Sequence, residues 1–516
     1  MIDARAIGAR HEPVTTQRAG RTTAKQQAAG GGYDAAERGA WDQRWTPRDE
    51  SPDIELSKDL PALRERCIDL VRNDPLAYGV IDTIAHGVVG RGPRPKSLAV
   101  STDVAAKLDA AWAAWTPSAG WDGMTSWADI CRGVVNASCL SGDVLILWPD
   151  VGDGTGPRVD LVDARRINSP ADSTPEVASS RLGVGYDRYG RVMGYYVSTG
   201  EGASTGRREG FRFFPTQRDG RINARLFKRP SVMRPRQSRA VPMFAPAALD
   251  LKDLREYRRT EVRRAQMAAK INTIIKTPDP KAITDAFENV EMSETLDGGG
   301  IADLLGRSYG TTPDGSMMVL GMGEDAIVVQ PPQVNGGTGD YVESMLRCVA
   351  SCTSLPFEEA FKLYAKLNFS NARTIRMMSK AVYRDWRDDL ESAVRNPTWT
   401  VFVQYAWASG VLGRIPWSAD LLACSWAWDE MEYVDPVKEI GANAEAIATG
   451  QRSIVDVCAG QGRDALAIMR AQADFEAAEA EYRKKLGLPP RGAVQATPAE
   501  PADPQQDDHN PQDPNA

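Results

Sequence analysis

The chain has 516 residues, of which 42% are hydrophobic and 25% are charged. This is the composition of a folded protein that can bury a core without disulfides. It contains no run of 18 apolar residues and no secretory signal pattern, so we expect neither a membrane span nor classical export. The formal net charge of −7 argues against a protein that grips nucleic acid over its whole surface, and it restricts any DNA contact to a local area.

The residue types that most catalytic and metal sites need are scarce. The three histidines are His11, His86 and His509, too few and too scattered for a histidine metal site or a Ser/His/Asp relay. None of the seven cysteines forms a C-x-x-C pair, and Cys348 and Cys352 are predicted to share one helix face as small core side chains in a reducing compartment. Phosphate-loop and hydrolase motifs are absent from the sequence. We therefore expect no metal, no cofactor and no ATP-driven activity.

Residues 1–50 are rich in Gly, Ala, Gln, Thr and Arg and have no hydrophobic periodicity, which predicts a flexible arm. Two helices follow over residues 57–90. The second starts at Pro75 behind an Asp74 cap, because proline at the first helical position needs no backbone donor, and Gly90 ends it. Apolar residues at helical spacing mark one face of each helix: Leu60, Leu63, Cys67, Leu70 and Val71 in the first, and Ala77, Val80, Ile81, Ile84 and Val88 in the second.

From residue 141 to 245 the pattern changes to short β-type runs separated by Gly and Pro. Strands are predicted over 144–147 and 159–163. The runs within 182–197 predict a hairpin that turns at Asp187–Gly190. This part of the chain is therefore expected to be β-rich.

A long charged helix is predicted over residues 247–276, with eight Lys or Arg and four Asp or Glu from Asp250 onward. An insert of about 60 residues bracketed by prolines follows, and its run at 316–330 predicts a hairpin. A shorter helix over 340–354 then leads into a loop at 356–372. By composition alone, the lysines of this loop and the charged helix are solvated surface.

The most regular helix begins near Ser370, and its apolar positions are Ile375, Met378, Val382, Trp386, Leu390 and Ala393. Asn396–Pro397 is predicted to end it, because a residue before proline avoids the α region. Residues 435–487 predict further helices, the first of which starts with an Asp435 cap and is followed by Gly450. The acidic, proline-rich segment 489–516 predicts a disordered tail.

The stretch 454–468 is similar to the glycine-rich first motif of S-adenosylmethionine-dependent methyltransferases. In such an enzyme Asp456, Gly460 and Gly462 would turn a strand into a helix around the cofactor. Two observations favour a helix–turn–helix instead. Ser453 and Asp456 form an S-x-x-D capping box, and too few residues follow for the remaining strands of a doubly wound sheet. The enzyme stays an alternative that cofactor binding would reveal.

Five stretches resemble, in their order, the phage portal proteins of the lambda family, from about Leu56 to Leu486. They are LRERCIDLVRNDPLAYGVIDTIAHGVVGRG (63–92), LVDARRINSP (161–170) with GVGYDRYGRVMGYYV (183–197), residues 234–270, LPFEEAF and NFSNART within 355–374, and residues 435–465. Three positions depart from the family pattern and concern local turn geometry. Ala240 stands where glycine is usual, Thr353–Ser354 replaces a turn with glycine, and Asn371 replaces serine.

The resemblance implies an α+β portal fold with a β-rich wing, long stem helices, a small α/β clip and a helical crown, assembled as a ring of about twelve copies. Its parts are expected at 1–50 (arm), 51–246 (wing), 247–276 (stem helix), 277–335 (clip), 336–355 (second stem helix), 356–372 (tunnel loop), 373–415 (wing helices), 416–488 (crown) and 489–516 (tail). Such a protein is not an enzyme, and it acts in the virion, at the capsid portal vertex, after assembly in the host cytoplasm.

The same resemblance places Lys362, Lys366 and Asn368 in a loop that faces passing double-stranded DNA. It implies as partners the large terminase subunit, the major capsid or scaffold protein and head-completion proteins, and it implies no membrane. An acidic ring suits a conduit, because each additional lysine–phosphate contact would hold the DNA more tightly. Another phage capsid or connector protein remains the second alternative, and electron micrographs that show shells or tubes in place of rings would favour it.

Overall fold

The computed structural model describes residues 50–99, 101–149, 156–170, 177–200, 210–229, 234–276, 310–312, 315–320, 337–365, 368–428, 436–460 and 465–487. The predicted arm 1–50, apart from its last residue, and the predicted tail 489–516 lie outside these residues, and so does the second strand of the hairpin predicted at 316–330. All elements named below belong to the compact unit Pro52–Ala516.

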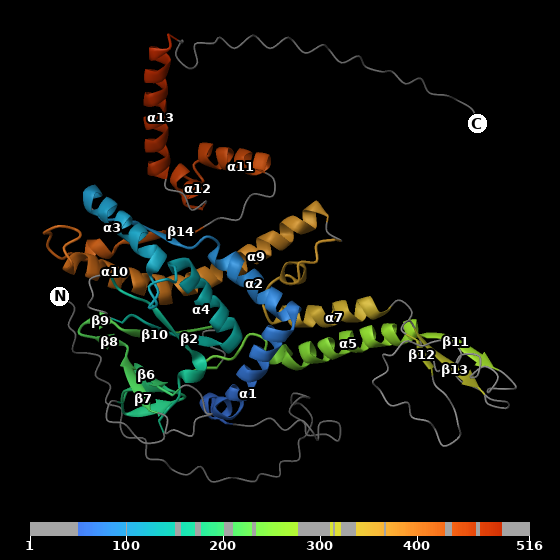
Figure 1. The fold of residues 1–516 in the computed structure, drawn as a ribbon. Coiled ribbons are helices and arrows are strands. Elements are labelled where there is room, and N and C mark those ends of the chain that lie inside the picture. Colours follow the sequence, from blue (N-terminus) through green and yellow to red (C-terminus); the bar gives the residue numbers. More distant parts are fainter. Residues whose placement is uncertain are drawn as a thin grey trace, which may run out of the picture. The chain divides into compact units, whose positions relative to one another are not determined.

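The two predicted N-terminal helices are confirmed as α1 (Pro52–Asn73) and α2 (Pro75–Val89) (Figure 1). The Asp74 carboxylate accepts a hydrogen bond from the Leu76 amide at 2.9 Å, which satisfies a backbone donor that the first turn leaves without a partner. Gly90 follows the helix with φ of 56°, a backbone conformation that glycine adopts without cost. The apolar stripe that was predicted for α2 is buried at every position: Ala77, Val80, Ile81, Ile84 and Val88.

The β-rich region forms small antiparallel sheets, as predicted. One sheet has the order β10 (Ala224–Lys228), β2 (Asp143–Leu147), β3 (Asp160–Asp163). A second has the order β4 (Ser179–Arg181), β5 (Val184–Tyr186), β6 (Val192–Ser198), β7 (Phe211–Pro215), and the β5–β6 turn lies at Asp187–Gly190 as expected. The hairpin β8 (Gln217–Arg218) with β9 (Arg221–Ile222) also belongs to this region, whereas the pair β1 (Arg94–Ser97) with β14 (Cys424–Ala427) lies outside it.

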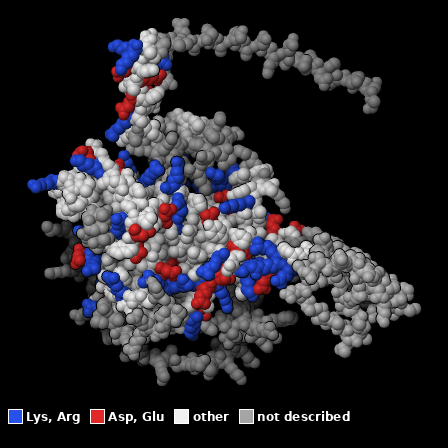
Figure 2. Space-filling view, in the orientation of Figure 1, with Lys and Arg blue, Asp and Glu red and all other residues white. Residues whose placement is uncertain are grey.

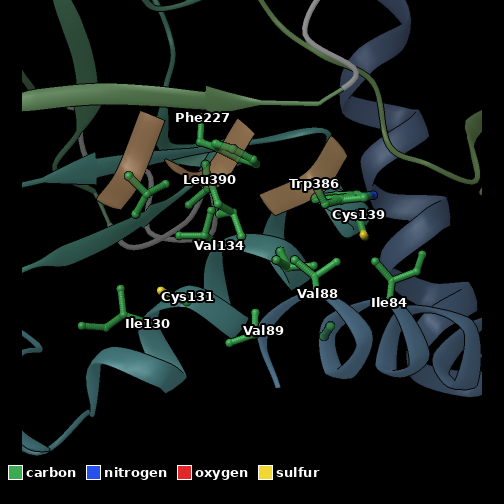
Figure 3. Close-up of a cluster of buried hydrophobic side chains, with 14 of the residues drawn as sticks. Ile84, Val88, Val89, Ile130, Cys131, Val134, Cys139, Phe227, Trp386 and Leu390 are labelled. Atoms are coloured by element: carbon green, nitrogen blue, oxygen red, sulfur yellow. The ribbon is translucent and has the colours of Figure 1, made fainter. Parts of the chain in front are cut away.

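The main core lies where α2 meets α4 (Trp127–Ser141), β10 and α9 (Phe369–Leu390). Figure 3 shows Ile84 and Val88 of α2 close to Cys139 of α4 and Trp386 of α9, with Phe227 of β10 packed over the same cluster. An aromatic group extends this core through α3 (Thr102–Trp115) and α10 (Asn396–Ala408). Trp112 lies at its centre, and five ring centroids lie 4.7–5.8 Å from that of Trp112: Trp115, Trp127, Trp399, Phe402 and Trp426.

The long charged helix ends earlier than predicted. Helix α5 covers Ala248–Lys270, and the last six residues of the predicted helix form strand β11 (Ile271–Lys276). Three isoleucines and a threonine in this run favour an extended backbone, and β13 (Gly315–Leu320) supplies a parallel partner. β12 (Gly310–Thr312) pairs with the start of β13. The second stem-like helix is α7 (Gly337–Ser351), so Cys348 is on a helix as predicted, but it is exposed and does not belong to the core.

The prediction that Pro397 ends a helix is wrong. After α9 the chain makes one π-helical turn, Glu391–Arg395, and continues directly as α10. Asn396 keeps α geometry (φ −61°, ψ −42°), because the wide turn places proline at the start of α10, where no backbone donor is missed. The buried face of the helix is also shifted from the prediction. Met378 is 58% exposed, whereas Ser379 and Tyr383 are buried.

Three helices close the described chain: α11 (Pro436–Ala448), α12 (Ile454–Gly460) and α13 (Ala465–Lys485). Gly450 has φ of 74°, as a residue that follows a helix end should. The predicted capping box is present, with Ser453 Oγ 3.1 Å from the Asp456 amide and the Ser453 amide 3.0 Å from Asp456 Oδ2. Among the described helices, none is both long enough and apolar enough to span a membrane.

Candidate functional site

The loop between α7 and α9 contains two residues in unusual backbone conformations. Ser354 has φ of 61° and Lys362 has φ of 57°, values that L-residues adopt at a cost. Between them lies the single-turn helix α8 (Phe357–Ala360). Ser354 is one of the positions where the family pattern has a glycine-containing turn, and the left-handed backbone explains why glycine is suited to it.

A carboxylate on α8 holds the loop against α9. Glu359 accepts hydrogen bonds from the hydroxyl of Tyr383 at 3.2 Å and from the hydroxyl of Tyr364 at 3.0 Å. Burial, followed by the charge of Glu359, raises the pKa of Tyr364 to about 12, and the same causes raise the pKa of Tyr383. On the other side, the Arg347 guanidinium lies 4.4 Å from the centre of the Phe357 ring. The loop is therefore anchored to both helices that flank it.

The three predicted loop residues differ in what the structure shows of them. Lys362 is 57% exposed at its side chain and lies 3.6 Å from the carboxylate of Asp82 on α2. Lys366 lies outside the described residues. Asn368 caps α9, because its side-chain oxygen accepts from the Asn371 backbone amide at 2.9 Å. The structure therefore shows a local role for this side chain, and its contact with DNA stays a prediction.

The stem-like helix α5 is fixed to the first two helices by ion pairs. Arg258 places Nη2 2.8 Å from the buried carboxylate of Asp74, between α1 and α2, and Arg255 lies 3.6 Å from Asp69. Along the exposed part of α5 acidic and basic side chains alternate, as Figure 2 shows where this helix reaches the surface. Tyr257 of α5 contacts Tyr341 of α7 at 5.3 Å between ring centres. The two helices thus lie side by side, with the β11–β13–β12 sheet beyond the end of α5 (Figure 1).

A buried charge cluster organises the β-rich region, and sequence reasoning missed it. Asp143, at the start of β2, is fully buried and binds Arg239 through two parallel hydrogen bonds, at 2.8 and 2.7 Å. Arg64 of α1 adds a third at 3.0 Å. Burial lowers the pKa of Arg64 to about 10, yet the group stays charged at neutral pH. A charged residue directly before the apolar run VLIL was the signal that could have revealed this cluster.

The two arginines also hold backbone carbonyls of the segment that carries the family resemblance. Arg239 donates to Ile167 O at 2.8 Å and to Leu182 O at 2.9 Å, and both Arg239 and Arg64 donate to Ala164 O. Ala164 belongs to the short 3₁₀ helix Ala164–Arg166. The motif LVDARRINSP is therefore a structural junction between α1, β2 and the second sheet.

The other two departures from the family pattern are also explained by the structure. Ala240 donates its amide to Asp143 Oδ2 at 3.1 Å and has no positive φ, so alanine fits without strain. The position that needs glycine is Gly142, which lies beside Ala240 in the fold, because an added Cβ at Gly142 would lie 2.6 Å from the Ala240 carbonyl oxygen. Asn371 contributes its backbone amide to the Asn368 cap. This contact does not depend on the side chain at position 371, so serine or asparagine can stand there.

The methyltransferase motif has the wrong secondary structure for its cofactor. Residues 454–460 are helical where that motif needs a strand, and Asp456 is engaged in the capping box with Ser453. In the N-terminal part of the chain, Gly87 lets α2 pack closely on α9, because an added Cβ at Gly87 would overlap the Tyr383 ring. Among the residues that the structure describes, no group of three or more His, Cys, Asp or Glu could hold a metal ion.

A sequence model described as phage portal protein, lambda family, matches residues 38–387. The chain belongs to this family. Two curated portal proteins match it over nearly all of their length, each with 22% identity. The match with the portal protein of Escherichia phage N15 covers 92% of this chain and 94% of the N15 protein. The match with portal protein B of Escherichia phage lambda covers 86% of this chain and 88% of the lambda protein.

Solved structures of gene transfer agent particles are also similar to this portal-family chain. The virion of the native particle matches with 14% identity and a TM-score of 0.39, and the neck of the empty particle with 12% identity and a TM-score of 0.40. In each case 86% of this chain and 95% of the other chain are covered. The family membership and the helix at 454–460 both argue against the methyltransferase alternative.

Proposed function

We propose that this portal-family protein forms a ring of about twelve copies at one vertex of a phage capsid, and that double-stranded DNA enters and leaves through its channel. The observation that supports this most directly is the pairing of α5 with α7, with a small strand module beyond the end of α5 and a loop after α7 that leads into α9. Two adjacent helices of this kind, repeated around an axis, can line a pore.

In this proposal α5 and α7 are the stem, the strands at 271–276 and 310–320 belong to the clip, and the loop around Lys362 is the tunnel loop. The helices α11 to α13 form the crown, and the sheets of β2 to β10 form the wing. The large terminase subunit, the capsid or scaffold protein and the head-completion proteins dock on the ring. A closed ring needs two different complementary faces on each subunit, and interleaved charges such as those on α5 suit such faces.

The tunnel loop makes transient contacts to the DNA backbone through Lys362 and Lys366. Lys362 is suited to this because its partner Asp82 is itself partly exposed, and an exposed pair of this kind contributes only about 0–1 kcal/mol. The lysine can therefore exchange Asp82 for a phosphate at low cost. Asn368 fixes the end of the loop through its cap on α9.

Two experiments test the proposal. Negative-stain electron microscopy of the purified protein should show isolated rings, and a persistent monomer, a closed shell or a tube would overturn the ring assignment. In a DNA packaging assay the double variant Lys362→Ala/Lys366→Ala should package or retain less DNA than the control Lys107→Ala, whose lysine is paired with Asp103 on α3. Unchanged packaging by rings of the double variant would remove the loop assignment and leave the ring intact.

A further inference from the structure

The charge of this chain is distributed unevenly. Residues 177–239 contain fourteen Lys or Arg and only four Asp or Glu, a net charge of +10, whereas the whole chain has a net charge of −7. The positive segment coincides with the hairpins β4 to β10. Within the described part of this segment, nine arginines are exposed. Six of them lie between the β5–β6 turn and β10 and are here named the wing arginines: Arg188, Arg191, Arg212, Arg218, Arg221 and Arg225.

Four of the wing arginines lie at hairpin tips. Arg188 lies in the turn between β5 and β6 and Arg191 directly follows it, and Arg218 and Arg221 face each other as the last pair of β8 and β9. Gly194 pairs with Pro215 at one end of the β6–β7 ladder, so Arg191 and Arg218 both lie beyond that same end. Thr216 connects the two hairpins, because its amide donates to Met193 O at 2.9 Å.

Each hairpin tip has one acidic residue beside its two arginines: Asp187 beside Arg188 and Arg191, and Asp219 beside Arg218 and Arg221. Asp187 binds Arg191 at 2.8 Å and also accepts the amides of Tyr189 and Arg191, and these contacts lower its pKa. Asp219 lies 3.8 Å from Arg218. In the part of the chain that the structure describes, no carboxylate pairs with Arg188, Arg212 or Arg225. Directly opposed like charges such as Arg218 and Arg221 destabilise a hairpin, and an anionic ligand would relieve that cost.

The tips also hold their guanidinium groups in position. The Arg188 and Arg191 guanidiniums lie 4.7 and 5.4 Å from the centre of the Tyr189 ring, and Arg212 lies 4.9 Å from the Phe214 ring. Contacts of this kind orient a planar cation and reduce the entropy that it loses on binding. A guanidinium held in this way can bind a phosphate through two hydrogen bonds.

We infer that the wing arginines bind the phosphate backbone of double-stranded DNA on the outside of the ring subunit, separately from the channel. Protein–protein interfaces have an apolar centre from which charge is depleted, whereas a charged, arginine-rich surface suits DNA phosphates. Tyr189 is already occupied by two guanidiniums, so it is not free to stack on the bases of a single strand. The contacts proposed here are with phosphates, which carry no sequence information, and binding is therefore expected to be independent of sequence.

The test uses the full chain and a relaxed, covalently closed circular DNA. A closed circle cannot thread through a closed ring, so it reports contacts outside the channel, and the result does not depend on the proposed channel role. The variant Arg188→Ala/Arg191→Ala/Arg218→Ala/Arg221→Ala should bind the circle at least about tenfold more weakly at low salt. The slope of log affinity against log salt should become shallower by about 3–4, since each lost phosphate contact contributes about 0.9.

The matched control removes four positive charges from other exposed positions, as Lys58→Ala/Lys107→Ala/Lys484→Ala/Lys485→Ala. It should retain most of the affinity, and the loop variant Lys362→Ala/Lys366→Ala should bind the circle normally. Circular dichroism and ring formation serve to show that the arginine variant still folds and assembles. The inference is overturned if the wild-type chain binds linear but not circular DNA, if both four-residue variants lose affinity equally, or if the arginine variant loses only the binding of a capsid protein.

Discussion

Arg239 holds Asp143 by two parallel hydrogen bonds, Nε to Oδ2 at 2.8 Å and Nη2 to Oδ1 at 2.7 Å, where both side chains are almost completely shielded from water. Asp143 also accepts from Arg64, and the two arginines donate to the carbonyls of Ala164, Ile167 and Leu182. The pair is therefore the point at which helix α1, the β10–β2–β3 sheet and the β4–β7 sheet are joined. Removing one partner would leave buried charge uncompensated.

We expect Asp143→Ala to reduce the free energy of unfolding by about 3–5 kcal/mol, because two buried guanidiniums lose their counter-charge. Urea unfolding followed by circular dichroism measures the change. The control Asp103→Ala removes a carboxylate that pairs with Lys107 on the surface and should cost less than about 1 kcal/mol. Equal effects of the two substitutions would contradict a structural role for the cluster.

Two glycines in α2 should respond to alanine in opposite directions. At Gly79 an added Cβ meets no atom within 4 Å, so Gly79→Ala should stabilise the protein by about 0.5–1 kcal/mol through helix propensity. At Gly87 the same atom would overlap the Tyr383 ring, and Gly87→Ala should destabilise by about 1–3 kcal/mol. Thermal unfolding of both variants under one condition compares them, and a shift of the same sign would refute the packing of α2 on α9.

Ser354 is predicted to be a position where glycine improves stability. It is exposed and has φ of 61°, and relief of the left-handed backbone should exceed the entropy that glycine adds to the unfolded chain. Ser354→Gly should raise the midpoint of urea unfolding by an amount that corresponds to about 0.5–1 kcal/mol. Ser354→Ala, which keeps a Cβ, should not. A lower midpoint for the glycine variant would mean that the turn geometry described here is wrong.

The contact between Glu359 and Tyr364 predicts a pH effect on the tunnel loop. The pKa of Tyr364 is raised to about 12, so its contribution to stability is fully present below the ordinary tyrosine value near 10 and is lost as pH rises through about 12. Spectrophotometric titration at 295 nm, taken as the difference between the wild type and Tyr364→Phe, isolates this group.

The substitution Glu359→Gln tests the cause of that shift. Removing the carboxylate charge should lower the pKa of Tyr364 and increase hydrogen exchange in residues 361–365, because two hydroxyl contacts weaken together. Glu358→Gln, one residue earlier on the same helical turn, has none of these tyrosine contacts and serves as the control. An unchanged titration in Glu359→Gln would show that burial alone raises the pKa.

Much of the local structure could be predicted from neighbouring residues. The cap at Asp74, the turn at Asp187–Gly190 and the Ser453–Asp456 box all form as the sequence indicates. In each case the groups that satisfy the backbone lie within about four residues of it, so no distant contact is needed. The order of these elements also sufficed to indicate the portal family, which the family match confirms.

Features that depend on distant partners were not predictable in this way. Residues 271–276 form a strand because β13 pairs with them, and Arg395 is buried at the π turn against Trp426 and Trp428. Neighbouring residues and their order are enough to indicate where these helices start, where the hairpin turns and to which family the chain belongs, because each of these depends on local groups. The tertiary structure alone decided which charges are buried, since the stability of a buried charge such as Asp143 depends on arginines about 80 and 100 residues away.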